Sequence, residues 1–280
     1  MSNSPSSDGT LQGVANEIPN VSATRIETPN HVVNLVPRIS ATKLAEYVVA
    51  DPSRKLTITK QAKLAQKAIM IPYSRVRSAF PGSLEPEGIS TSFLNARAAD
   101  AESHHSENPW QQGDNIRSAA ALRHLAALAD QIECKNAQHI HRPEGGWGPL
   151  MISGVRVSVQ PELVFTIEHR GSTKVGAVIL NTGKNENLSL ARAAQKFTVG
   201  DYLTVLVMRM LESRLKGYGV PLHTRCHAID IFRDKIYTAP ASFKTLLKHI
   251  EASCTMIALQ WPTIPLEIDS ETDALVVGAE

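Results

Sequence analysis

One stretch, residues 155–184, constrains the fold more than any other part of this 280-residue chain. Its apolar residues alternate in two runs, which a His-Arg-Gly-Ser segment at 169–172 separates. Alternation with a period of two is typical of strands, and a short glycine-containing segment between two such runs indicates a hairpin turn. Pro161 and Glu162 lie at the start of one run, and Lys184 follows the other. We therefore predict a β-hairpin with a carboxylate where one strand begins and a lysine just past the end of the next.

Helical and strand patterns surround this hairpin. We expect, in chain order, a helix over 114–135, short strands at 150–152 and 155–157, a helix from 188 to about 216, strands at 224–232 and 235–239, and a helix over 243–259. Apolar residues at helical spacing define the buried stripe of the first helix as Ile116, Leu122, Leu125, Leu128 and Ile132. Gly200 is a candidate interruption of the long helix. These patterns predict an α/β fold with a mixed central sheet flanked by helices.

The composition is that of an ordinary globular protein, with 42% hydrophobic and 20% charged residues. A net charge of +2 is too small to indicate a polyanionic partner, so evidence for such a partner must come from local clusters of basic residues. Three cysteines without close spacing argue against a disulfide framework and favour a cytoplasmic location. The first twenty residues lack the features of a secretory signal, and no apolar stretch approaches the roughly 20 residues that cross a bilayer. We therefore predict no membrane association.

Composition also changes along the chain, and it predicts five segments. These are a flexible N-terminal arm at 1–38, a basic helical unit at 39–80, a linker at 81–113, an α/β domain at 114–264 and an acidic tail at 265–280. The basic unit holds eight lysines and arginines against Glu46 and Asp51, a local charge of +6. Candidates for contact with nucleic acid are Lys60, Lys63, Lys67, Arg75 and Arg77. A helix would place the three lysines on one face, which fits either a solvated surface or a phosphate-contacting one.

From 114 to about 240 the expected order is helix, three strands, helix, strand. With Pro161-Glu162 and Lys184, this order resembles the PD-(D/E)XK, or restriction-endonuclease-like, nuclease superfamily. The resemblance implies an α-β-β-β-α-β core, preceded here by the small helical unit. The whole chain is also similar to an uncharacterised bacterial family, with a Ser-Ala-Thr-Lys-Leu-Ala-Glu-Tyr helix at 40–47, which implies no function.

The nuclease resemblance also implies a chemistry. Glu162 would be a ligand of Mg²⁺, a hard cation that prefers oxygen, and Lys184 would stabilise developing charge on a phosphate. The motif requires a second acid near the end of the next strand, where Asn181 is the nearest polar residue. Glu133 could supply a carboxylate from the preceding helix. Gln195 and Lys196 would lie beside the phosphate. In the alternative interpretation, Glu162 begins a strand at a solvent-exposed edge and Lys184 is a turn lysine.

The motif is degenerate in this chain. Two residues before Lys184 stands Thr182 rather than an acid, and the alternative alignment puts Ala177 and Ile179 at the acid and lysine positions. The sequence therefore leaves three hypotheses. The first is a Mg²⁺-dependent nuclease, the second is a non-catalytic protein that binds DNA or RNA, and the third is an interaction or structural subunit with a protein partner or a second copy of itself.

Overall fold

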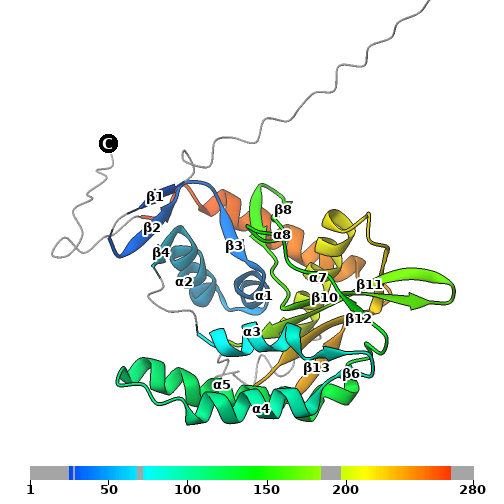
Figure 1. Cartoon of the computed structure of the whole chain (residues 1–280). Helices are drawn as coiled ribbons and strands as arrows, with labels where there is room; N and C mark the ends of the chain where they lie inside the picture. The colour runs from blue at the N-terminus through cyan, green and yellow to red at the C-terminus, as the bar shows by residue number, and fades with distance from the viewer. Residues whose placement is uncertain (1–24, 28, 68–71, 184–196, 266–280) are drawn as a thin grey trace, which may run out of the picture.

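The centre of the protein is a five-stranded mixed sheet (Figure 1). The computed structural model describes residues 25–27, 29–67, 72–183 and 197–265. The strands are β7 (Gln138–His139), β10 (Leu163–His169), β11 (Ser172–Asn181), β12 (Val220–Asp230) and β13 (Lys235–Thr238). Their order across the sheet is β13-β12-β11-β10-β7. All neighbours are antiparallel except β11 and β12, which are parallel and lie on either side of the helix α7 (Val199–Arg214) in the chain.

The predicted hairpin is β10 and β11. Their antiparallel register runs from Leu163 opposite Val178 to His169 opposite Ser172. The turn holds Arg170 and Gly171 at φ angles of 52° and 73°, a left-handed conformation that glycine adopts without steric cost. Because side chains alternate along a strand, this register places the two faces of the hairpin in two different cores.

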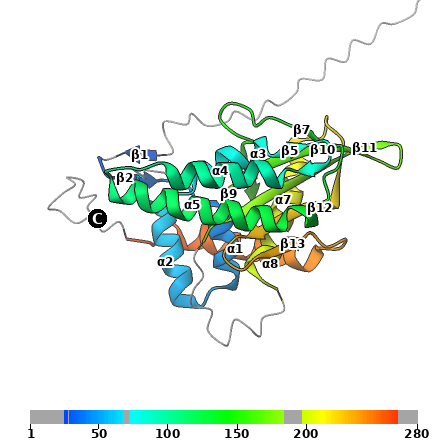
Figure 2. The same cartoon turned by 60° about the horizontal axis from the view of Figure 1, so that its bottom comes forward.

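Helices cover both faces of the sheet, so the predicted α/β class with a mixed sheet is confirmed. On one face, Val164 and Ile179 pack with α7, α1 (Ala41–Val49) and α8 (Lys244–Gln260). On the other face, Leu163 and Leu180 pack with helices that Figure 2 shows in front of the sheet. These helices are α3 (Ser74–Gly82), α4 (Thr91–Ser103) and α5 (Pro109–Leu128). A short 3-10 helix (Ala129–Gln131) follows α5.

The predicted arm and the predicted linker hold more structure than we expected. Part of the expected flexible arm, 1–38, forms strands β1 (Arg25–Glu27) and β2 (His31–Asn34), and β2 pairs with β4 (Leu64–Gln66) after α2 (Pro52–Lys63). The expected linker, 81–113, contains a hairpin of β5 (Leu84–Glu85) and β6 (Gly88–Ile89), then α4 and the first turn of α5. Side chains cap both helices, since Ser90 accepts from the Phe93 N–H and Asn108 from the Trp110 N–H.

Because Asn108 caps α5, this helix starts five residues before its predicted start at Asp114. Asp114 and Asn115 are therefore buried inside it rather than at its end. Leu122 and Leu125 lie in the core as predicted, but Ile116 is 56% exposed, so its place in the buried stripe was wrong. Gly200 does not interrupt α7 either. It lies in the first turn, where a Cβ atom would come 2.2 Å from the Tyr237 ring, so its lack of a side chain lets the helix approach β13.

The short strands before the hairpin lie outside the central sheet. β8 (Pro149–Ile152) and β9 (Val155–Ser158) form their own hairpin, and β9 pairs in parallel with β3 (Arg38–Ser40). The strands expected at 150–152 and 155–157 thus lie in a different sheet from the hairpin strands that follow them. Pro161 offers a physical reason, because a residue without an N–H cannot continue a ladder of hydrogen bonds between β9 and β10.

Candidate functional site

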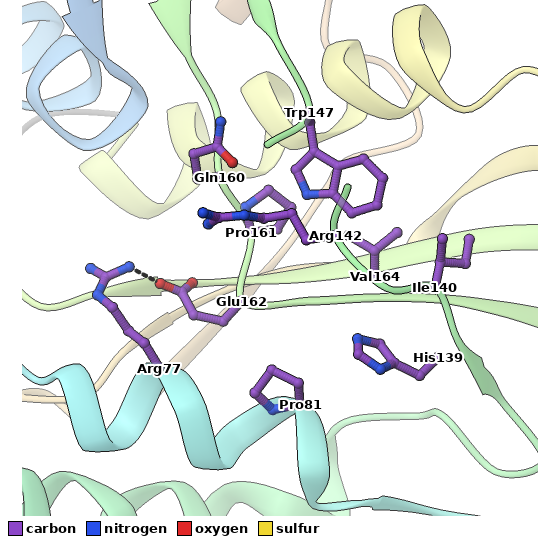
Figure 3. Close-up of a pocket in the computed structure, with 10 residues that line it drawn as sticks. All are labelled: Arg77, Pro81, His139, Ile140, Arg142, Trp147, Gln160, Pro161, Glu162 and Val164. Atoms are coloured by element: carbon purple, nitrogen blue, oxygen red, sulfur yellow. Dashed lines mark hydrogen bonds and ion pairs between the residues drawn. The ribbon is translucent and has the colours of Figure 1, made fainter. Parts of the chain in front are cut away.

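Glu162 lies at the edge of the central sheet, immediately before β10. Its backbone N–H donates to the carbonyl of Val178 at 3.0 Å, which extends the hairpin by one residue. Its carboxylate accepts hydrogen bonds from the Leu180 N–H, at 2.7 Å, and from the guanidinium of Arg77 (Figure 3). Only 3% of the Glu162 side chain is exposed, so the expected alternative of a solvent-exposed strand start is wrong.

Burial controls the ionisation of Glu162. Loss of solvent raises the pKa of its carboxyl, although Arg77 and the Leu180 N–H act in the opposite direction. The charged form is therefore disfavoured compared with a carboxylate in water. Both carboxylate oxygens also have hydrogen-bond partners within the protein. A metal ligand must instead be ionised and must have an oxygen available to the ion.

Asn181, the last residue of β11, lies beside a carboxylate that sequence reasoning missed. Its amide Nδ2 donates to Asp230 Oδ2 at 3.3 Å, and its Oδ1 accepts from the Gly183 N–H at 3.2 Å. Asp230 ends β12, and burial raises the pKa of its carboxyl against the effect of Arg233. The carboxyl ends of parallel strands lie at one edge of a sheet. The last acidic residue of the strand predicted after the long helix was therefore a usable signal for Asp230.

A second carboxylate that we did not expect comes from α1. Glu46 lies on the buried side of this helix and pairs with Lys43, at 2.9 Å, and with Arg54, at 3.6 Å. A Cβ atom on Gly183 would lie 3.1 Å from Glu46 Oε1 and 3.3 Å from Asn181 Oδ1. The start of the basic unit is therefore folded against the end of β11, at the same edge of the sheet as Glu162.

The described side chains do not fit the predicted Mg²⁺ site. Glu162 is engaged by Arg77 and Leu180, and both polar atoms of the Asn181 amide are used within the protein. Across residues 25–27, 29–67, 72–183 and 197–265, no three His, Cys, Asp or Glu side chains are placed to share an ion. Lys184, Gln195 and Lys196 lie outside the described residues.

Glu133 does not belong to this site. It follows the 3-10 helix with 67% of its side chain exposed, and it pairs with Arg225. Both residues line a separate cavity of about 480 Å³, together with Asp130 and Lys135. The structure therefore does not bring Glu133 to Glu162, because the helix that was expected to end at 135 stops at Leu128 and the chain turns away.

The predicted lysine face is also wrong, because α2 ends at Lys63. Lys60 is exposed, but the ammonium group of Lys63 points inward and donates to the carbonyls of Trp261 and Ile264, both at 2.8 Å. Lys67 lies beyond β4 and pairs with Glu27 at 3.1 Å. The three lysines therefore lie in three different environments and form no common phosphate-binding stripe.

The two arginines of α3 hold the helix in place. Arg75 donates through Nε to Asn115 Oδ1 at 2.8 Å and lies 3.8 Å from Asp100, which connects α3 to α5 and α4. Arg77 lies two residues further along, and its guanidinium reaches Glu162. Of the candidates for contact with nucleic acid that lie among the described residues, Arg77 is the one placed at the sheet edge with Glu162.

A cavity of about 230 Å³ opens beside the Arg77–Glu162 pair. Its wall includes Arg142, Trp147 and Gln160, which sequence reasoning did not select (Figure 3). Three buried polar atoms on this wall have no hydrogen-bond partner in the described structure: Arg77 Nε, Trp147 Nε1 and Gln160 Oε1. The available signal was a tryptophan in the glycine-rich segment 145–149.

A second hollow, of about 440 Å³, lies next to the first. Arg25, Arg38 and Lys43 line it, together with Ser158 of β9. The Gln160 amide of the first cavity donates to the Ser158 hydroxyl at 3.5 Å, so the two hollows are neighbours. Basic side chains from four elements, β1, β3, α1 and α3, thus line these two neighbouring hollows.

A scan against protein-family models and a search of curated proteins each give no match for this chain. Within the described part of the chain, no helix combines the length and apolar character needed to cross a membrane. Cys134, Cys226 and Cys254 are buried free thiols.

Proposed function

We propose that this protein binds nucleic acid at the Glu162 edge of the central sheet and does not hydrolyse it. The proposal includes a restriction-endonuclease-like core built from α5, the β10–β11 hairpin, α7 and β12. The order and pairing of these elements support it, with β11 and β12 parallel on either side of α7 in the chain. The short β7 and β13 complete the sheet at its two edges.

One observation carries the non-hydrolytic part of the proposal. The carboxylate that should bind metal is buried and paired with the guanidinium of Arg77. A guanidinium on Glu162 provides the positive charge that Mg²⁺ would otherwise provide, but it cannot generate a hydroxide nucleophile from bound water. The Arg77–Glu162 pair therefore stabilises the fold at the position where a nuclease would hold its ion.

The basic side chains of the two neighbouring hollows support the binding part. Arg77 and Arg142 line the first hollow, and Arg25, Arg38 and Lys43 line the second. Arginine presents a planar set of donors that matches phosphate oxygens. Contacts of this kind release counterions from the nucleic acid, so affinity should fall steeply as salt concentration rises.

Fluorescence anisotropy with labelled DNA and RNA oligonucleotides tests the proposal. We expect binding at about 50 mM KCl that weakens by at least tenfold by about 200 mM. Arg38→Gln should reduce both the affinity and the slope of its salt dependence. Arg97→Gln is the matched control, since it removes the same charge from an exposed position on α4, outside both hollows. Failure to bind any nucleic acid at the low salt concentration would overturn the binding proposal.

A plasmid-nicking assay with Mg²⁺ or Mn²⁺ tests the absence of hydrolysis separately. We expect no cleavage above that of a protein-free control. Metal-dependent cleavage that disappears in Glu162→Gln would overturn the non-hydrolytic proposal. The variant is informative because glutamine keeps the size of the side chain and can still accept the hydrogen bond from Leu180.

A further inference from the structure

We propose that the cavity beside the Arg77–Glu162 pair binds a phosphate monoester, such as the phosphorylated end of a nucleic-acid strand. That the phosphate belongs to a nucleic acid rests on the proposed function, whereas the preference for a monoester rests on the cavity itself. Its polar wall, its charge and its shape each support this assignment.

The polar wall contains N–H groups that lack acceptors. Trp147 is 8% exposed, and its indole Nε1 makes no hydrogen bond within the described structure. Arg77 uses a terminal nitrogen for Glu162, but its buried Nε also has no partner there. Buried donors without acceptors are costly, and native proteins contain few of them. Both residues line the cavity, so a ligand bound there is a source of acceptors for these donors.

The charge of the cavity favours an anion. Arg77, His139, Arg142 and Glu162 are the titratable side chains that line it. Arg77 and Glu162 offset one another, and both Glu162 oxygens already accept hydrogen bonds from the protein. Arg142 is exposed and forms no ion pair with the described carboxylates, so its charge remains available to a ligand. In the view of Figure 3, its guanidinium lies between Gln160 and Glu162.

The shape favours a monoester over an internal phosphodiester. Ile140, Val164 and Trp147 are buried residues of the lining, while Arg142 lies exposed, so the cavity leads inward from Arg142. A phosphodiester has two substituents that must leave in different directions, whereas a monoester has one. The volume of about 230 Å³ is also below the usual range for drug-sized ligands, and it suits a phosphate with part of its sugar. Gln160 Oε1, which has no described partner, can accept a hydrogen bond from a sugar hydroxyl.

Anisotropy measurements on the full chain test this inference. The probes are single-stranded oligonucleotides that carry a 5′-phosphate, a 3′-phosphate or only hydroxyl ends, with the label at the opposite end or inside the strand. We expect one phosphorylated form to bind on the order of tenfold more tightly than the hydroxyl form, which corresponds to about 1.4 kcal/mol. Equal binding of all three probes would overturn the inference and leave the proposed function intact. If no probe binds, the proposed function fails as well.

Variants test the assignment to this cavity. Trp147→Phe removes the N–H and retains most of the ring, so the preference for the phosphorylated end should fall while binding of the hydroxyl probe is unchanged. Trp110→Phe, at an exposed position on α5, is the matched control and should change neither. Arg142→Gln should abolish the preference. A preference that survives both cavity variants would overturn the assignment.

Competition with inorganic phosphate distinguishes a phosphorylated strand end from free phosphate as the ligand of the cavity. As a competitor, inorganic phosphate should displace the phosphorylated probe down to the affinity of the hydroxyl probe and no further. Binding of inorganic phosphate that depends on Trp147, without any preference for phosphorylated ends, would show that the cavity takes the free ion and would overturn the strand-end proposal.

Discussion

Arg77 on α3 and Glu162 at the start of β10 form a hydrogen-bonded ion pair, although 85 positions separate them in the chain. The carboxylate is buried, while 38% of the Arg77 side chain is exposed to solvent. This contact fixes α3 against the edge of the sheet and takes up the carboxylate that the nuclease resemblance assigns to a metal ion.

Arg77→Met should destabilise the protein, because it leaves a buried carboxylate without its counter-charge. We expect a loss of roughly 3 kcal/mol in the free energy of unfolding, at the low end for a broken buried pair because Arg77 is partly exposed. Guanidinium denaturation measures this. Adding Glu162→Gln to Arg77→Met should recover most of the loss, since no buried charge then remains. A single variant within about 0.5 kcal/mol of wild type would contradict the structural role of the pair.

The raised pKa of Glu162 predicts a pH dependence of stability. An unfolded glutamate titrates near its ordinary value of 4.5, whereas the buried group binds its proton up to a higher pH. Between these two values the folded state binds more protons than the unfolded state, so the contribution of Glu162 to stability falls as pH rises. Unfolding free energies measured across this range should show the decrease as a difference between wild type and Glu162→Gln, because the opposite contribution of His227 is present in both proteins. Asp230, whose carboxyl pKa is also raised by burial, contributes to both proteins and cancels in this difference.

His227 predicts a pH dependence of the opposite sign. Burial lowers the pKa of this histidine from 6.5 to about 4, and its Nδ1 lies 3.0 Å from the Thr238 hydroxyl. The unfolded state therefore binds more protons between these values, and the contribution of His227 to stability should fall by roughly 3 kcal/mol as pH falls from 6.5 to 4. His227→Gln should flatten this part of the curve in urea denaturation. The exposed His105→Gln should not, and equal slopes in the two variants would refute the assignment to His227.

Lys63 and Lys60 provide a contrast within one helix. Lys63→Met removes the ammonium that donates to the carbonyls of Trp261 and Ile264, and it should cost about 2 kcal/mol because buried acceptors lose a charged donor. Lys60→Met, three residues earlier at an exposed position, should lie within about 0.5 kcal/mol of wild type. Thermal unfolding of the two variants measures the difference. Equal melting temperatures would mean that Lys63 does not hold α2 to the end of α8.

Local patterns predicted the local elements of this fold. Alternating residues predicted the β10–β11 hairpin, and helical spacing placed Leu122 and Leu125 in the core. The position of Glu162 at a strand start was also correct, because proline and the strand pattern are both properties of neighbouring residues. Asp230 was within reach of the same reasoning, since its strand was expected to follow the long helix and parallel strands end at one edge of a sheet.

Contacts between distant segments were not predictable in this way. Neither the spacing of Lys60, Lys63 and Lys67 nor their charge shows that Lys63 meets carbonyls near residue 261. The cavity likewise combines Arg77, Arg142 and Trp147 from separate parts of the chain. Three-dimensional packing decides which basic residues stabilise the protein and which remain available to a ligand, and charge counts along the sequence do not contain that information.

The parallel pairing of β3 with β9 affects how the protein assembles during translation. Arg38 of β3 pairs with Arg156 of β9, so β3 must wait for more than a hundred further residues to leave the ribosome. At typical rates of synthesis this delay is on the order of ten seconds. Throughout that time the strand presents unpaired backbone groups that other chains can bind. The N-terminal strand β3 is therefore open to pairing with other chains until β9 has been synthesised.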